Sequence, residues 1–351
     1  MTTDLLTPAA HGDAPAPVRG RRGVPAAVAI LVVAVLGAAA ASTVIGARWI
    51  PLAAILDSAD AQHGIAEARL DRTLLGLAVG GALGLVGALM QGLTRNPLAD
   101  PGILGINAGA SLAMVIAISA FHFFDLRTYV WFGFAGAGIA MVLVHVVASL
   151  GRSGRSGGRD GATPMKIAIA GAAVTAAVTS WTQAVLLTDR QTIEAFRLWS
   201  VGTVGGRGTD VLLVGLPFLA VGAVLGLASV RSLNALALGD DLARGLGRRV
   251  VVDRAVVGLA VVLLAGASTA LAGPIAFVGL IVPHAVRAVV GPDYRRVLPL
   301  SLGYGAVLVV VADTLGRIAL PPGEVQVGIM TAVVGAPFFL VLIRRGRMGA
   351  L

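Results

Sequence analysis

Apolar residues gather along this chain in long stretches that carry few charges. A helix needs about 20 such residues to cross roughly 30 Å of hydrocarbon. The stretches that come near this length are 24–45, 73–93, 103–120, 129–150, 165–188, 211–230, 251–272, 274–291, 297–318 and 325–343. The pattern predicts an all-α, polytopic membrane protein with about ten transmembrane helices.

The third and eighth stretches are short and are interrupted by Gly or Pro. Broken spans often line a pathway, because neighbouring helices or water satisfy the freed backbone groups. The pattern also divides the chain into a disordered tail (1–23), one transmembrane domain (24–343) and a C-terminal tail (344–351).

The first stretch follows three arginines and ends in small residues, as a secretory signal does. Its apolar run of about 22 residues is longer than the roughly 7–15 of a signal peptide. We therefore expect an uncleaved first helix.

The composition fits lipid better than water. Of the 351 residues, 57% are hydrophobic and 13% are charged, and the mean hydropathy is +0.89. A soluble domain of this size could not cover that much apolar surface with polar groups. The chain has no Cys, which excludes disulfides, thiolate catalysis and Cys-ligated metals.

The net charge of +9 could attract nucleic acid or a membrane surface, and its distribution favours the membrane. With the N-terminus placed in the cytoplasm, sixteen arginines fall on inside segments and seven on outside loops. Arginine is enriched on the cytoplasmic side of membrane proteins. We expect both termini in the cytoplasm and no nucleic-acid partner.

A short repeat suggests internal symmetry. Arg72 and Arg254 are each followed, four residues later, by Gly-Leu-Ala-Val at the start of a span. The two spans are expected to run in opposite directions, as an inverted repeat requires. Chance similarity in a chain this rich in Gly, Ala, Leu and Val remains an alternative.

Three polar blocks interrupt the apolar pattern. The first, QGLTRNPLADPGILG at 91–105, contains Gln91, Asn96 and Pro97, and Asn-Pro is a turn signal. A plain turn does not require a Gln, an Asn and two Pro within eleven residues. We expect the block to have a role beyond a turn.

The second block is GPIAFVGLIVPHAVR at 273–287. Gly273 and Pro274 separate two spans. Pro283 is a helix stop or kink, and His284 is either an interfacial polar residue or a functional one. Metal binding by His284 is not expected, because no second ligand stands at a suitable spacing.

The third block extends from Asp313 to Phe339. Asp313 and Arg317 are four residues apart on one helix face, so they can pair within the membrane. These three blocks together resemble the FecCD family over about residues 65–343. This family comprises the BtuC-like permeases of type II ABC importers for iron–siderophore, haem and cobalamin. Asp71, Tyr294 and Gln326 depart from its usual pattern.

The polar loop 231–250 contains leucines at every fourth position. The spacing predicts a short amphipathic helix that presents an apolar stripe to a partner or lies on the bilayer. The family resemblance implies instead a coupling helix seated in a groove of an ATPase. The residues concerned are Leu238, Gly239, Asp240, Asp241, Leu242, Ala243, Arg244, Leu246 and Gly247.

Three arginines, Arg69, Arg72 and Arg317, stand near the expected outer ends of spans. They could be interfacial anchors, whereas the resemblance implies that they dock an extracytoplasmic binding protein. The loop 189–210, which includes Trp199, is similar to the family's short external gating helix, and an ordinary connecting loop is the alternative.

The chain lacks a P-loop, because its one lysine, Lys166, is flanked by Met165 and Ile167. ATP and Mg²⁺ would therefore be bound by a separate ATPase subunit, and this chain would bind no cofactor and be no enzyme. The resemblance implies as partners a second permease copy or sister, two ATPases and a binding protein.

These observations favour the permease of an ATP-driven importer, with an iron–siderophore-type chelate as cargo. A haem or cobalamin permease of the same family is one alternative. An ion-coupled carrier is another, but few ionisable groups are expected at mid-membrane. A membrane enzyme lacks a visible catalytic constellation.

Overall fold

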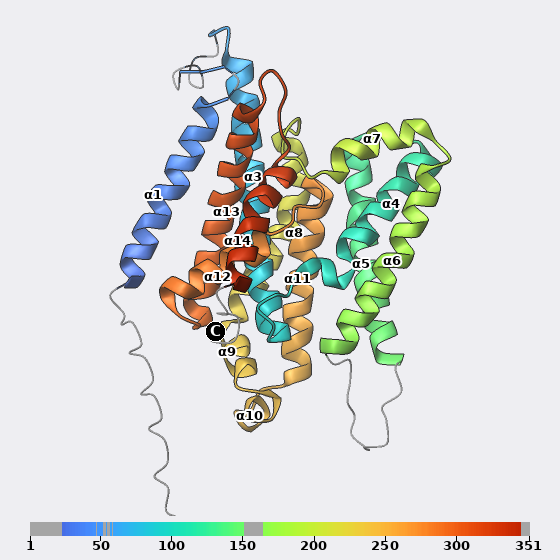
Figure 1. The fold of residues 1–351 in the computed structure, drawn as a ribbon, viewed down its shortest axis with the longest axis vertical. Helices are drawn as coiled ribbons and strands as arrows, with labels where there is room; N and C mark the ends of the chain where they lie inside the picture. Colours follow the sequence, from blue (N-terminus) through green and yellow to red (C-terminus); the bar gives the residue numbers. More distant parts are fainter. Residues whose placement is uncertain are drawn as a thin grey trace, which may run out of the picture.

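The computed structural model describes residues 23–46, 48–51, 54, 57, 59–150 and 164–344, and every regular element in these ranges is a helix. The elements are α1 (Gly23–Val44), α3 (His63–Thr94), η1 (Pro101–Leu104), α4 (Ile106–Phe121), α5 (Leu126–Leu150), α6 (Pro164–Leu186), α7 (Arg190–Ser200), α8 (Thr209–Ala228), α9 (Val230–Ala237), α10 (Asp240–Gly245), α11 (Val250–Ala272), α12 (Val278–Val290), α13 (Tyr294–Ala319) and α14 (Val327–Arg344). Figure 1 shows them as an upright bundle.

Each of the ten expected spans coincides with one helix of this bundle. Seven helices are long and apolar enough to cross a membrane, and three shorter apolar ones are α4, α12 and the described part of α14. The all-α, multi-span prediction is confirmed. The predicted tails at 1–23 and 344–351 lie almost wholly outside the described residues, as does the arginine-bearing loop 151–163.

The eighth span begins later than expected. The predicted stretch started at Pro274, but α12 starts at Val278. Gly273 ends α11 with φ +75° and ψ −179°, a conformation open essentially to glycine alone. The backbone therefore leaves the helix before Pro274 and re-enters it four residues later.

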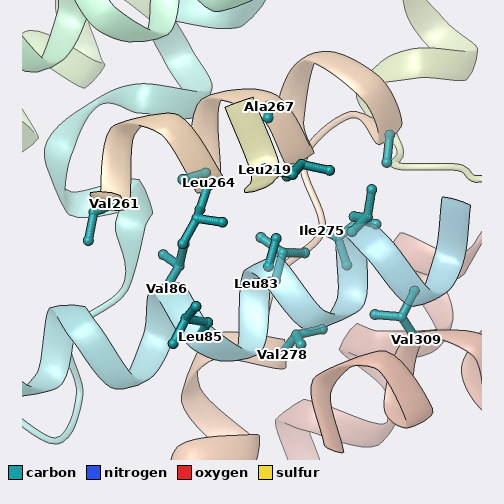
Figure 2. Close-up of a cluster of buried hydrophobic side chains, with 14 of the residues drawn as sticks. Leu83, Leu85, Val86, Leu219, Val261, Leu264, Ala267, Ile275, Val278 and Val309 are labelled. Atoms are coloured by element: carbon teal, nitrogen blue, oxygen red, sulfur yellow. The ribbon is translucent and has the colours of Figure 1, made fainter. Parts of the chain in front are cut away.

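Helix α3 forms the centre of the bundle. It packs against α8, α11, α12 and α13, and 83% of its most apolar stretch is buried. Figure 2 shows Leu83, Leu85 and Val86 of α3 among apolar side chains of neighbouring helices, including Leu264 and Val309. Burial on all sides explains why this stretch of α3 is apolar around its whole circumference.

Small residues let the helices around α3 approach closely. A Cβ built at Gly87 would overlap the backbone of Gly279 in α12, and one at Gly80 would overlap the Gly305 carbonyl in α13. Helices in lipid associate through such close backbone contacts, because lipid supplies no hydrophobic force between them. The abundance of glycine is thus part of the packing.

The outer helices expose large apolar side chains. Ile139 of α5 and Ile169 of α6 are 68% and 64% exposed. Figure 1 places α9 and α10 at one end of the bundle, called the lower end here, and α7 at the upper end. In the same view α3 descends and α11 ascends, so the two repeat-bearing helices are antiparallel.

Candidate functional site

Residues 231–250 form two short helices, not the single amphipathic helix that the leucine spacing predicted. Gly239 has φ +107°, which side-chain-bearing residues rarely adopt, and it separates α9 from α10. The predicted apolar residues are nevertheless at the surface: Leu238, Leu242 and Leu246 are 58%, 62% and 63% exposed. We call these three the leucine surface, and exposed apolar groups of this kind are typical of partner contacts.

Asp240 attaches α10 to two spanning helices. Its carboxylate accepts hydrogen bonds from Arg95, which caps the end of α3, and from Arg254 of α11 at 3.0 Å. We call these three residues the Asp240 clamp. Ala243 also faces inward and is fully buried. By contrast, Asp241 is fully exposed and pairs with Arg244 at 2.8 Å, so the predicted coupling residues divide into an inner and an outer set.

Further polar contacts hold α9. Arg248 pairs with Asp253 of α11 at 2.6 Å and also reaches Ser232. The Asn234 side chain donates to Asp293 at 2.9 Å and accepts from the Tyr294 amide at 3.1 Å. The segment is thus bonded to the starts of α11 and α13, and sequence reasoning had named none of these contacts.

Gln91 supplies a hydrogen bond to a backbone carbonyl of α12 that Pro283 leaves without its helical partner. Pro283 lies inside α12 and does not stop the helix, but it has no N–H for the carbonyl four residues earlier. That carbonyl belongs to Gly279, and it accepts a hydrogen bond from Gln91 Nε2 at 3.1 Å. Gln91 Oε1 accepts from Arg287, whose guanidinium carbon lies 5.7 Å from the centre of the Tyr294 ring.

All three motif blocks meet at a small pocket. Pro97 and Leu98 lie there beside His284, with Phe277 and the phenylalanines at 338 and 339. The His284 ring is 6.2 Å from that of Phe338, edge to face. Asn96 Oδ1 accepts from the Leu98 amide at 2.9 Å and fixes the turn after α3. His284 is 8% exposed and packs against Phe338.

The predicted helix within loop 189–210 is present as α7. Asp189 caps it, accepting bonds from the Thr192 hydroxyl and the Gln191 amide, and these bonds, the Thr192 bond foremost, lower the pKa of Asp189. At the other end of α7, Trp199 is buried, with Nε1 3.4 Å from the Ala270 carbonyl. A Cβ added at Gly273 would overlap the backbone carbonyl oxygen of Trp199.

The turn after α7 is hydrogen-bonded to two spans, α11 and α14. The Thr203 amide donates to the Ala272 carbonyl at 2.7 Å, at the end of α11. The Gly202 carbonyl accepts from the Gly328 amide at 3.1 Å, in the first turn of α14. The segment 201–204 therefore contacts the break between α11 and α12 and the start of α14.

Gly273→Ala is expected to reduce the free energy of unfolding by about 1–3 kcal/mol, since the backbone there is open essentially to glycine and the methyl group would overlap the Trp199 carbonyl. Thermal unfolding of the purified protein in a fixed detergent measures the change. Gly64→Ala is the matched control, because nothing lies within 4 Å of its Cβ position. Equal melting temperatures for the two variants would contradict the prediction.

At the upper end, Asp313 binds two arginines. Arg72 donates to both of its carboxylate oxygens at 2.8 Å, and Arg317 Nε lies 3.4 Å from one of them. The predicted pairing of Asp313 with Arg317 is confirmed. Arg72 also pairs with Glu324 at 2.7 Å. We call these four residues the upper charge cluster.

This geometry sets Arg317 apart from the other two predicted docking residues. The Arg317 side chain is 3% exposed and binds the Ser42 hydroxyl at 2.7 Å, so it is enclosed by the bundle. Arg69 is half-buried and donates to the carbonyls of Val44, the last residue of α1, and of Arg48, which follows that helix. Glu324 is 46% exposed and was not predicted as a site residue. The signal in the sequence was its carboxylate, which stands in a short loop beside the helix ends that carry the arginines.

The three departures from the family pattern have local partners. Asp71 accepts a hydrogen bond from the Thr209 hydroxyl at the start of α8. Tyr294 lies buried beside Arg287. The Gln326 carbonyl accepts the amides of Ile329 and Met330 and so opens α14.

Relatives of known class match most of the chain. The chain is 41% identical to the ferric enterobactin transport system permease protein FepD of Escherichia coli over 331 residues, which are 92% of this chain and 96% of that one. It is 42% identical to the Fe(3+)-citrate import system permease protein YfmD of Bacillus subtilis (84% and 85% covered). It is 37% identical to the hemin transport system permease protein HmuU of Yersinia pestis (80% and 82%).

A solved structure has the same fold. A metal-chelate type ABC transporter in an inward-facing conformation superposes with a TM-score of 0.80 at 24% identity, covering 92% of this chain and 99% of that one. The sequence profile of the FecCD transport family matches residues 29–345, which include all three motif blocks. The chain is therefore a multi-pass membrane protein that belongs to the FecCD transport family.

Proposed function

We propose that this chain is the permease subunit of an ATP-driven importer and carries an iron–siderophore-type chelate across the bacterial cytoplasmic membrane. The permease names of its relatives support the class. The structural observation that carries the proposal is the leucine surface, which protrudes at the lower end and is bonded to α3 and α11 through the Asp240 clamp.

The lower end would face the cytoplasm, as the distribution of arginines suggests. Two ATPase subunits would bind ATP and Mg²⁺ and contact the leucine surface of each permease copy. A second copy of this chain, or a homologous sister, would complete the pathway. An extracytoplasmic binding protein would dock at the upper end, where Arg69, Arg72 and Glu324 are partly exposed.

The cargo is proposed from the relatives, most of which are named for ferric chelates. One relative is a haem permease, so haem is the second candidate and cobalamin the third. ATP binding would act by favouring one arrangement of α10 over another, and the Asp240 clamp would pass that preference to α3 and α11.

Uptake by proteoliposomes that contain this chain, its ATPase and its binding protein tests the proposal. We expect ferric-siderophore uptake that requires ATP and continues when the proton gradient is collapsed. Uptake that stops with the gradient while ATP is held constant would instead indicate an ion-coupled carrier. Parallel assays with haem and cobalamin identify the cargo.

A further inference from the structure

A groove distinct from the small pocket of the motif blocks lies on the outer side of the bundle, between α1, α12 and α13, and its α12 wall includes the outward side of the second block. Its volume is about 420 Å³, within the range of roughly 300–1,000 Å³ typical of small-molecule sites. Apart from Tyr304, every residue that lines it is aliphatic. The Tyr304 hydroxyl is already engaged, because it donates to the Ala27 carbonyl at 3.2 Å. The groove therefore suits an apolar occupant.

The length of the groove corresponds to one half of a bilayer. On α13 the lining residues extend from Leu300 to Val311, a distance of about 16 Å at the helical rise of 1.5 Å per residue. Half of the hydrocarbon core measures about 15 Å. Leu300 is the seventh of the 26 residues of α13 and Val311 the eighteenth. Because α13 starts at the lower end of the bundle (Figure 1), the groove would lie mainly in the lower leaflet.

A positive charge stands at the lower mouth of the groove. Arg296 lies one turn before Leu300 on the same face of α13 and is partly exposed. Its Nη1 donates at 3.4 Å to the carbonyl of Val290, which lines the groove. This contact is long for a hydrogen bond, and a guanidinium has five N–H groups in all. The exposed side chain of Arg295 adjoins it.

Asp293 is the acidic group near these arginines, and it is already engaged. Its carboxylate accepts from the Arg295 amide at 3.0 Å and from the Asn234 side chain at 2.9 Å. These bonds, the backbone bond foremost, lower the pKa of Asp293. The bonded carboxylate caps α13 and also attracts both arginines, whose side chains are exposed (Arg295) or partly exposed (Arg296) and so remain accessible to an anion.

We propose that this groove binds one anionic phospholipid of the lower leaflet, with an acyl chain along α13 and the phosphate at Arg296 and Arg295. Basic groups at the ends of membrane helices bind anionic headgroups in this way. The bound chain would fill the space between α12 and the loosely packed α1, only 22% of whose apolar window is buried. This site is independent of the transported cargo.

Native mass spectrometry and thermal unfolding of the purified full-length protein test the proposal. The probes are phosphatidylglycerol and phosphatidylcholine with identical acyl chains, and inorganic phosphate. We expect preferential retention of phosphatidylglycerol and a melting temperature that rises by several degrees with it. Arg295→Gln with Arg296→Gln should abolish the preference, and Ala285→Phe, which fills the groove, should reduce retention of both lipids.

Two further variants keep these outcomes decisive. Arg231→Gln removes an exposed arginine of α9 at the same end and should retain the lipid preference. Arg296→Lys keeps the charge and should retain most of it. Equal retention of both lipids by the unmodified protein, or an equal melting shift with inorganic phosphate, would overturn the proposal. So would a change of oligomeric state in Ala285→Phe, because a second protein copy would then occupy the groove.

Discussion

Asp313→Ala is expected to lower the free energy of unfolding by about 3–5 kcal/mol, the typical cost of removing one partner from a buried ion pair. The change leaves Arg72 and Arg317 without their shared carboxylate, although their side chains are only 11% and 3% exposed. Arg317 would keep the Ser42 hydroxyl as a neutral partner, which does not compensate its charge. Denaturant unfolding in a defined micelle measures the loss.

Glu324→Gln is the matched control, because it removes a carboxylate bound to the same arginine at a site that is 46% exposed. Exposed ion pairs contribute about 0–1 kcal/mol, so this variant should remain near the unmodified protein. If both variants lose the same stability, burial does not govern the upper charge cluster and the prediction fails.

Leu242→Asp is expected to reduce ATP-dependent uptake by about 30-fold, corresponding to the 2 kcal/mol or more typical of a central contact residue at a protein interface. The side chain is 62% exposed, so the substitution should leave the fold intact. Copurification of the ATPase with the permease, together with uptake in proteoliposomes, measures the effect. Normal uptake by a well-folded variant would exclude the leucine surface as the ATPase contact.

Variants of two neighbouring aspartates distinguish binding of the ATPase at this surface from transmission of its movement to the spanning helices. Asp241 is fully exposed, and Asp241→Asn should change uptake little. Asp240→Asn weakens the bonds to Arg95 and Arg254 without altering the leucines. It should retain the ATPase and its hydrolysis while uptake falls. A simultaneous reversal of Asp240, Asp241 and Arg244 would mix these two effects.

Hydropathy and spacing sufficed for the spans because lipid imposes a length and a polarity on every helix. The same reasoning failed at residues 238–246, where a period of four suggested one helix. There Gly239, with its positive φ, overrides the spacing. A period in the sequence records which side chains are exposed, but not whether the backbone between them is continuous.

The partners of polar residues were harder to predict. The pair Asp313–Arg317 is local and followed from spacing, whereas Gln91 and Gly279 are 188 residues apart. Their contact depends on Pro283 freeing a carbonyl in another helix. Likewise, Arg317 was expected outside because its place along the chain resembles a span end, and only the packing of α1 against α13 shows that it is enclosed.

The turn at 201–204 has a mechanical consequence. It is hydrogen-bonded on one side to the last turn of α11 and on the other to the first turn of α14, and Trp199 anchors it from α7. A rigid displacement of this turn would therefore shift the break before α12 and the start of α14 together. Under such a displacement the break before α12 and the start of α14 would move in the same step, with no intermediate in which only one of them had moved.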